Sequence, residues 1–468
     1  MAILGSNKQA PAIAPRPIGR KGELALGIVR RLQEAGFPAY WVGGCVRDFL
    51  LEKEPQDYDI ATGAPPEQTE RLFLRTVPVG RQFGILIVIE QDYRFEIATF
   101  RAEADYQDGR RPNRITYSDA TADAQRRDFT VNGLFYDPVR RQLFDWVNGQ
   151  QDLRDKTIRT IGNPAERFAE DHLRLLRAVR FAAQLGFQIE PDTLSALQTF
   201  APKSVQVSAE RIREELLKLF RPPQAARGLD LLRLTGLLAH VLPEIAALIP
   251  CEQSPDFHPE GSAYDHVRLM LELLPADAAS SLPWAVLLHD IGKPPTTTRD
   301  PVTGLPHFYG HEKAGADLAE AVLMRLKFPG KQIEEIVACV RHHMQFKDVP
   351  RMRKSTLRRV LMRSTFPLEL ELHRLDCVGS HQNLEIYRRL VAEAEQLRTQ
   401  PHLRPPLLHG HDLIAMGWPA GPVMGQVLRE IRERQLEDEL TTPAQARAWA
   451  HEQMAGRLGA KPQPGSAK

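Results

Sequence analysis

The chain has 468 residues, 43% hydrophobic and 26% charged, which is enough for roughly three or four globular domains. Its net charge of +2 argues against a uniformly basic nucleic-acid-binding protein and leaves any RNA contact to local patches. The scattered cysteines argue against a disulfide scaffold or a cysteine zinc site and favour a cytoplasmic location; they are Cys45, Cys251, Cys339 and Cys377. We find neither a signal peptide nor a run of about 20 apolar residues, so no membrane partner is expected.

The N-terminal third carries an α/β pattern. A helix is predicted over 23–36, followed by strands near 39–43, 57–61, 83–90 and 93–100. The last two strands are separated only by Gln91 and Asp92, which predicts a hairpin. A polar loop over 102–114 precedes strand-like pieces near 115–118 and 134–145. From residue 164 the apolar residues recur at helical spacing, and the first such helix stops at Gly186.

These patterns predict a multidomain protein with a small α/β head and all-α domains after it. The expected divisions are a disordered tail (1–22), the head (23–163), a helical neck (164–225), a third domain (226–400), a helical tail domain (401–456) and a disordered end (457–468).

Residues 41–59, WVGGCVRDFLLEKEPQDYD, are the most informative stretch. A short apolar run ends in Gly43-Gly44, and a helix with Arg47 in its first turn follows. A glycine turn, an arginine and a helix N-terminus together favour phosphate binding. Asp57 and Asp59 lie two apart on a predicted strand, which sends both carboxylates to one face, where they can hold divalent ions. This combination is typical of a metal-dependent nucleotidyl transferase.

Such two-metal chemistry often needs a third carboxylate, and Glu96 on the neighbouring strand is our candidate. A second motif, Arg126-Arg127-Asp128-Phe129-Thr130-Val131-Asn132, follows the polar loop. A third, Glu170-Asp171-His172-Leu173-Arg174, opens the first neck helix.

In that helix Asp171 and Arg174 are three residues apart and share a face. A carboxylate beside a guanidinium matches the edges of cytosine and adenine, and leaves buried polar groups unpaired against uracil and guanine.

Together these motifs resemble the head of the polymerase beta superfamily, and more closely the class II, bacterial-type family of CCA-adding enzymes and poly(A) polymerases. The resemblance implies addition of CMP and AMP from CTP and ATP to tRNA 3′ ends with Mg²⁺ and no nucleic-acid template. No DNA partner is expected. It also implies that Asp128 and Asn132 hold the ribose, Arg127 lies near the triphosphate, and Glu170 completes the base-reading element.

The resemblance extends to the residues around the neck. Arg177 continues the base-reading stripe toward phosphate, while Arg211 and Glu215 support the neck. The mixed acidic and basic loop at 102–114, with Asp105, Asp108, Arg110, Arg111 and Arg114, favours complete CCA addition.

A second constellation follows the neck. His266 on a predicted helix, the dyad His289-Asp290 and the distant Asp376 can make one metal site. His311 and His343 could complete a second ion site, and Lys293 could receive a phosphate. The dyad and its flanks resemble an HD-type metal-dependent phosphohydrolase domain. The resemblance implies a divalent metal of unidentified kind and hydrolysis of a phosphomonoester or cyclic phosphate.

Three alternatives remain open at this point. The segment VGRQFGILIVI (79–89) also fits a poly(A) polymerase or A-adding enzyme of the same family. An HD hydrolase with an idle head is a rival of another class, and a non-catalytic RNA-binding protein is a third. The densest basic stretch, 347–364, and the segment 410–440 are the expected tRNA-binding regions, and the oligomeric state stays open.

Overall fold

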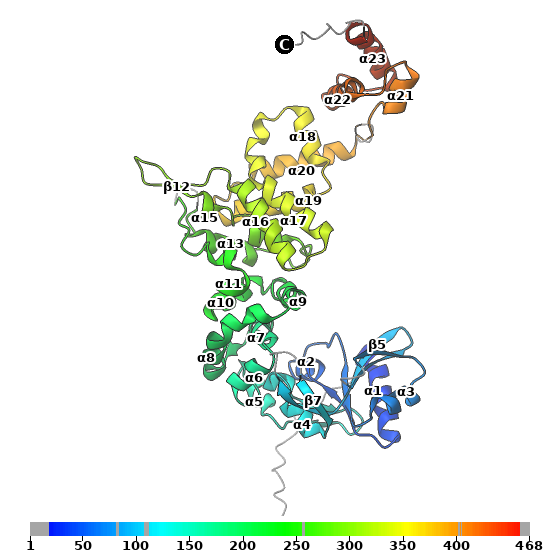
Figure 1. Cartoon of the computed structure of the whole chain (residues 1–468), viewed down its shortest axis with the longest axis vertical. Helices are drawn as coiled ribbons and strands as arrows, with labels where there is room; N and C mark the ends of the chain where they lie inside the picture. Colours follow the sequence, from blue (N-terminus) through cyan, green and yellow to red (C-terminus); the bar gives the residue numbers. More distant parts are fainter. Residues whose placement is uncertain are drawn as a thin grey trace, which may run out of the picture. The chain divides into compact units, whose positions relative to one another are not determined.

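The computed structural model describes residues 18–80, 84–106, 112–254, 258–400, 403 and 405–458. Contacts divide the chain into two compact units, Met1–Ala246 with Arg325–Lys327 and Ala247–Met324 with Phe328–Lys468 (Figure 1). Within the described ranges, no helix combines the length and apolarity that a membrane crossing requires. Most of both predicted tails lies outside these ranges.

The head is built on a mixed sheet. In the described part it has seven strands in the order β3-β4-β5-β2-β1-β8-β9, with β2 and β5 parallel. Its elements are α1 (Gly19–Glu34), β1 (Ala39–Val42), α2 (Gly44–Leu50), β2 (Asp59–Thr62), α3 (Pro66–Leu72), β3 (Thr76–Gly80), β4 (Ile85–Glu90), β5 (Tyr93–Thr99), β6 (Arg101–Tyr106), β7 (Pro112–Tyr117), α4 (Ala120–Gln125), the 3₁₀ helix η2 (Thr130–Asn132), β8 (Phe135–Asp137), β9 (Gln142–Phe144), α5 (Gly149–Arg154) and β10 (Thr157–Ile158).

The neck is helical, as its 3.6-residue periodicity predicts. It comprises α6 (Pro164–Glu170), α7 (Leu173–Leu185), β11 (Gln188–Ile189), α8 (Pro191–Phe200), η3 (Ala201–Gln206), α9 (Ala209–Leu219), α10 (Ala225–Leu234), α11 (Leu237–Val241) and α12 (Pro243–Ala246). Helix α7 ends at Gly186, whose φ of 71° is a left-handed conformation that glycine adopts without strain.

An aromatic cluster fixes helix α2 against the sheet. Trp41 on β1 is fully buried, stacks on Phe49 of α2 with ring centroids 5.9 Å apart, and meets Tyr58 edge-on at 5.0 Å. Aromatic pairs of this kind add to the stability that burial provides. The cluster therefore holds the Gly43-Gly44 turn, which joins β1 to α2, in a constant place above the strand ends.

The strand predictions hold with shifted boundaries. The predicted hairpin is the antiparallel pair β4–β5, in register from Ile85↔Ala98 to Glu90↔Tyr93. The helix predicted over 23–36 begins earlier, at Gly19. Most of the predicted loop over 102–114 is instead the β6–β7 hairpin; residues 107–111 and the side chains of 102–106 and 112–116 lie outside the described part.

Two local predictions are wrong. Strand β2 starts at Asp59, so Asp57 precedes it and does not share its face by alternation. The helix predicted to run through Asp171 is interrupted there: α6 ends at Glu170, and Asp171 has extended backbone (φ −143°, ψ 106°) before α7 starts at Leu173. The hydrophobic pattern continues across the break, which is why the sequence conceals it.

The second unit is helical in the described residues, apart from the short pair β12–β13. Its elements are α13 (Ala263–Glu272), α14 (Leu282–Leu288), α15 (Lys293–Thr296), β12 (Thr298–Arg299), β13 (Pro306–His307), α16 (His311–Arg325), α17 (Gly330–His342), η4 (His343–Arg351), α18 (Lys354–Leu361), α19 (Phe366–Gly379), α20 (Glu385–Arg398), α21 (Gly410–Ala415), α22 (Pro422–Leu436) and α23 (Pro443–Leu458).

The basic stretch 347–364 is largely neutralised within this unit. Arg358 and Lys354 pair with Asp438, Arg359 pairs with Glu433, and Arg363 pairs with Glu369. The pairs with Asp438 and Glu433 join α18 to α22 and its C-terminal end, and the pair with Glu369 joins Arg363, which follows α18, to α19. The pairing weakens the prediction that this stretch lies along a nucleic-acid backbone, because four of its seven basic residues already have carboxylate partners.

Candidate functional site

The glycine turn forms one wall of a pocket in the first unit. Gly43 has a φ of 70°, and a Cβ on it would lie only 3.2 Å from Nη1 of Arg127. Both the backbone conformation and the close approach therefore require glycine here. Arg47 on α2 donates through Nη1 to Oδ1 of Asn132 at 2.8 Å, so the first and second motifs meet at this wall.

The carboxylates form the floor of the same pocket. Because Ile60 pairs with Ile97 in parallel register, Asp59 and Glu96 lie side by side on β2 and β5. Although the side chain of Asp59 reaches the surface, the surrounding pocket walls desolvate it, and this desolvation, helped by repulsion from Glu96 and Asp57, raises the pKa of Asp59 to about 6, while Arg127 opposes the shift. Asp57 is exposed and pairs with Lys21 at 2.6 Å. Three mutually repelling carboxylates form a set that a divalent cation would stabilise.

The second motif supplies a buried ion pair. Oδ2 of Asp128 accepts from Arg177 Nε at 2.7 Å, and its Oδ1 accepts from the backbone N–H of Phe129 at 2.8 Å. Burial alone would raise the pKa of Asp128, but Arg177 holds it below its ordinary value. Both residues line the pocket, together with Asn132.

The base-reading residues have partners different from those predicted. Arg211 of α9 binds Asp171 through two contacts, Nη2–Oδ2 at 2.8 Å and Nη1–Oδ1 at 3.3 Å. Arg174 instead binds Glu170 Oε2 at 2.5 Å. Arg211, expected only to support the neck, thus lies in the pocket, whereas Glu215 does bind within the neck, to Arg180 at 2.5 Å.

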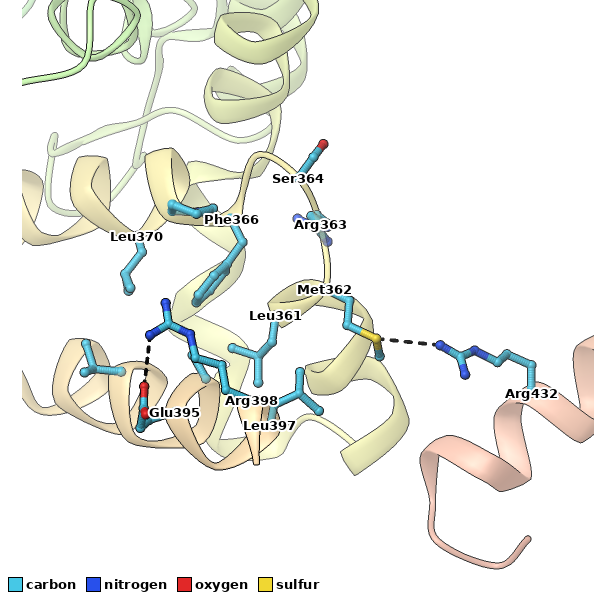
Figure 2. A pocket seen from close by; sticks show the side chains of 13 residues that line it. Leu361, Met362, Arg363, Ser364, Phe366, Leu370, Glu395, Leu397, Arg398 and Arg432 are labelled. Atoms are coloured by element: carbon cyan, nitrogen blue, oxygen red, sulfur yellow. Dashed lines mark hydrogen bonds and ion pairs between the residues drawn. The ribbon is translucent and has the colours of Figure 1, made fainter. Parts of the chain in front are cut away.

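All but two of the predicted head and neck site residues line this one pocket of about 470 Å³. Asp57 and Glu170 are absent from its lining, but Asp57 raises the pKa of Asp59 and Glu170 binds Arg174. A larger pocket of about 700 Å³ in the second unit is shown in Figure 2. It is lined mainly by apolar residues such as Leu361, Phe366 and Leu370, and none of the predicted site residues lies in it. The larger volume is therefore not where the predicted chemistry gathers.

The histidines and aspartates of the second unit meet in a buried cluster. Nε2 of His266 lies 3.1 Å from Asp376 Oδ1, and Nε2 of His289 lies 3.2 Å from Asp290 Oδ2. His266, His289 and Asp376 form one group that could hold an ion, and Asp290, His311 and His343 form another. The two oxygens of Asp290 face different groups, since Oδ1 lies 3.6 Å from His311 Nε2.

Each of these imidazoles is oriented through its Nδ1 atom. Nδ1 of His289, His311 and His343 lies 2.7–2.8 Å from the carbonyl oxygen three residues earlier. Nδ1 of His266 instead lies 2.6 Å from Oε1 of Glu260. With Nδ1–H donating in all four rings, Nε2 is left to bind a metal.

The cluster fits a divalent metal. In the described chain, Nε2 of His266 and of His289 are buried without a hydrogen-bond partner, although both point at carboxylate oxygens. Burial and the neighbouring His289 lower the pKa of His343 to about 3, so that ring is neutral as a ligand must be. Lys293 pairs with Asp290 at 2.7 Å and donates to Gln253 at 2.5 Å. Imidazole and carboxylate ligands together suit divalent metals, and Mn, Ni, Co, Mg and Fe are not distinguished by this ligand set.

Several site residues were missed from the sequence: Lys21, Asp123, Arg211 as a pocket residue, Gln253 and Glu260. Each acts on a partner that belongs to a predicted motif. Two of them had a local signal: Glu260 lies six residues before His266, and Asp123 lies three and four residues before its arginine partners. Lys21, Arg211 and Gln253 depend on contacts that no local pattern reveals.

Three family models match separate parts of the chain. Residues 39–159 match the poly A polymerase head domain, residues 186–249 match a probable RNA and SrmB-binding site of polymerase A, and residues 258–372 match the HD domain. The crystal structure of the Bacillus stearothermophilus CCA-adding enzyme in complex with CTP is 28% identical, with a TM-score of 0.73, covering 94% of this chain and 100% of that one.

The chain thus carries a poly A polymerase head domain and an HD domain, and over most of its length it resembles the family of CCA-adding enzymes.

Curated relatives in this family include the CCA-adding enzyme of Geobacillus kaustophilus, 44% identical over 228 residues, or 48% of this chain and 56% of that protein. The CCA-adding enzyme of Enterococcus faecalis is 46% identical over 196 residues, or 42% of this chain and 48% of that protein. The chain thus spans about half the length of the curated relatives it matches. The Thermotoga maritima CCA-adding enzyme complexed with tRNA shares the fold, with a TM-score of 0.56 and 20% identity.

Proposed function

We propose that the protein is a tRNA nucleotidyltransferase that adds CMP and AMP from CTP and ATP to tRNA 3′ ends without a nucleic-acid template. The observation that carries the proposal is the convergence of the glycine turn, the Asp59–Glu96 carboxylates and the Asp171 and Arg174 side chains on one pocket. Phosphate-binding, metal-binding and base-reading groups meet there, as this reaction requires. Its substrates would place the protein in the cytoplasm.

The reaction is attack of the tRNA 3′-hydroxyl oxygen on the α-phosphorus of the nucleotide, with pyrophosphate leaving. Asp57, Asp59 and Glu96 would hold Mg²⁺, which when bound favours loss of the hydroxyl proton and neutralises the triphosphate. The Gly43-Gly44 backbone and Arg127 bind the phosphates, and Asp128 and Asn132 position the ribose.

Base selection falls to the Asp171 carboxylate and the Arg174 guanidinium. In the absence of nucleotide their hydrogen-bonding groups are bound to Arg211 and Glu170. A cytosine or adenine edge replaces these partners with matching ones, whereas uracil or guanine leaves buried groups unpaired.

The test is incubation of the protein with Mg²⁺ and a tRNA lacking its CCA end, with each NTP singly and together, followed by product sequencing. C, C and then a single A supports the proposal. A alone on tRNA ending in CC means an A-adding enzyme, and a long A tail means a poly(A) polymerase. CC alone would contradict the prediction of complete CCA addition that was based on the 102–114 segment.

We propose a second activity for the HD domain: metal-dependent hydrolysis of a phosphomonoester or cyclic phosphate. The supporting observation is the buried His–Asp cluster with two groups of ligands that share Asp290. Phosphatase and cyclic phosphodiesterase assays with Mn, Ni, Co, Mg and Fe test it. No activity with any of these metals would refute it. If the HD activity is the main one, Asp57→Ala and Asp59→Ala leave it intact.

Our domain assignment remains a proposal as well. It comprises the head (23–163), the neck (164–225), the HD domain (226–400) and the tail (401–456), with tRNA contacts in the neck and tail. Limited proteolysis with mass mapping tests these boundaries.

A further inference from the structure

A buried carboxylate lies behind the second motif. Asp123 on α4 is 0% exposed, and each of its oxygens binds a different arginine. Oδ1 accepts from Arg126 at 2.9 Å (Nε) and 2.6 Å (Nη2), and Oδ2 accepts from Arg127 at 3.3 Å (Nε) and 3.1 Å (Nη2). A buried carboxylate is tolerated only when it is paired in this way, so its position and those of both guanidinium groups are mutually fixed.

Arg127 is the one of these two arginines that would face the phosphates. Its Nε and Nη2 atoms are bound to Asp123, which directs Nη1 toward Gly43, and its guanidinium lies 5.0 Å over the ring of Phe135. From there it lowers the pKa of Asp59. Asp123 therefore sets the place of a positive charge that lies between the glycine turn and the pocket carboxylates.

Arg126, the other arginine bound to Asp123, contacts a residue that would read the base. Its carbonyl oxygen accepts from Nη2 of Arg174 at 3.1 Å, although the two residues are 48 positions apart. The other donor group of Arg174, Nη1, binds Glu170 and the carbonyl oxygen of Arg167. Fixing the Arg126 side chain to Asp123 thus helps to fix the main chain that orients Arg174.

We propose that Asp123 is a positioning residue that couples phosphate binding to base selection: one oxygen places Arg127 on the triphosphate and the other places Arg126, and through it Arg174, on the base. The proposal rests on the proposed nucleotidyl transfer. Asp123 would contact neither substrate nor metal and would act through these two arginine side chains; its Oδ1 also accepts from the backbone N–H of Arg101 at 3.3 Å, which helps to fix the carboxylate.

The central variant is Asp123→Asn, which keeps the shape but cannot accept from both arginines with full charge. We expect the KM for CTP and ATP to rise about tenfold, in line with the loss of charge-assisted hydrogen bonds. UMP and GMP incorporation, relative to CMP and AMP, should rise in parallel. The matched control is Asp119→Asn, which alters an exposed cap on the same helix that accepts from the Ala122 N–H.

Two further variants test the Arg127 contact and the Arg126 contact separately, and they keep the test decisive should Asp123→Asn fold poorly. Arg127→Lys should raise the KM and leave base discrimination nearly unchanged. Arg126→Lys should relax discrimination with a smaller change in KM. Asp123→Glu should restore part of both properties.

Calorimetric binding of CTP and UTP measures the same preference without turnover. If the wild-type protein binds CTP selectively but transfers nothing, the proposed function fails while this inference is still tested. A lower melting temperature of Asp123→Asn with unchanged KM, CTP affinity and discrimination would overturn the inference, because Asp123 would then be only a structural residue.

Discussion

The two candidate sites differ in how far their charged groups are exposed to solvent. In the head pocket, Asp59 is open to solvent, Asp57 is exposed, and arginines from four different elements surround them. In the HD cluster, His266, His289, Asp290 and His343 are at most 5% exposed and face one another directly. An open, arginine-rich pocket suits a large anionic ligand that enters and leaves, whereas a closed cluster of histidines suits an ion that stays.

The two sites also differ in the contacts that their residues make when no ligand is bound. Head residues are bound to neighbours that a ligand must replace, as Asp171 is to Arg211 and Asp57 is to Lys21. In the HD cluster, Nε2 of His266 and of His289 have no hydrogen bond to exchange, whereas Nε2 of His311 and of His343 lie 3.0 Å apart and bind each other. Ligand binding in the head is therefore a substitution of contacts, and in the HD cluster it adds contacts at one group and replaces one at the other.

The largest expected effect is a loss of nucleotidyl transfer that leaves metal binding in the HD domain unchanged. Asp59→Asn removes a metal-facing charge from the pocket floor, so we expect nucleotidyl transfer to fall about 10³-fold or more. Metal content of the HD domain, measured by elemental analysis, should not change. Asp92→Asn, in the exposed turn between β4 and β5, is the control. If Asp59→Asn retained nucleotidyl transfer, the head pocket would not be the site of the proposed reaction.

The reciprocal change is Asp290→Asn. Because Asp290 faces both ligand groups, its loss should weaken metal binding about 100-fold or more, measured by calorimetry on metal-stripped protein. CMP and AMP addition should persist. Asp317→Asn on α16, an exposed residue that pairs with Arg341, serves as the control. Normal metal affinity in Asp290→Asn would show that the two groups do not share a ligand.

A steric change tests how rigid the HD cluster must be. A Cβ on Gly292 would lie 2.1 Å from the carbonyl oxygen of His311 and 2.5 Å from the N–H nitrogen of Gly315. Gly292→Ala should therefore destabilise the second unit by about 3 kcal/mol and loosen its metal. Thermal unfolding followed by calorimetry measures this, with Gly330→Ala as control, since nothing lies within 4 Å of that position. An unchanged transition would contradict the close packing.

The smallest effect concerns acid stability of the first unit. Burial alone would raise the pKa of Asp128, but Arg177 lowers it, so the charged form is favoured in the folded state. Its contribution to stability is present above the unfolded pKa of about 3.9 and is lost as the pH falls through the lower folded value. Asp128→Asn should cost about 2 kcal/mol at pH 7 and little at pH 3. Denaturant titrations at both pH values measure the difference; equal losses at both would contradict the assignment.

The sequence predicted most of both sites because their key residues occur in local patterns. Gly43-Gly44 with Arg47, and the His289-Asp290 dyad, are each contiguous, and the β2–β5 register that joins Asp59 to Glu96 follows from strands of matching pattern. Asp57 was misplaced because the predicted strand was started at residue 57, two residues before the chain enters the sheet at Asp59. The break at Asp171 was hidden by uninterrupted apolar periodicity.

Residues whose role depends on burial or on distant partners could not be predicted in this way. Asp123 lies only three and four positions before its two arginine partners, yet its importance comes from complete burial, which only the packing of α4 reveals. Arg211 meets Asp171 across 40 positions of chain. Charge pairing over such separations is a property of the folded neck and head together, and no spacing rule contains it.

The Nδ1 contacts of the HD histidines have one more consequence. Since main-chain carbonyls aim His289, His311 and His343, the cluster is assembled before any ion arrives. Because the ligand atoms are already aimed, little reorganisation of the chain opposes the binding of an ion. We therefore expect metal affinity in this cluster to depend on the ligand atoms themselves and not on a rearrangement of the helices that carry them.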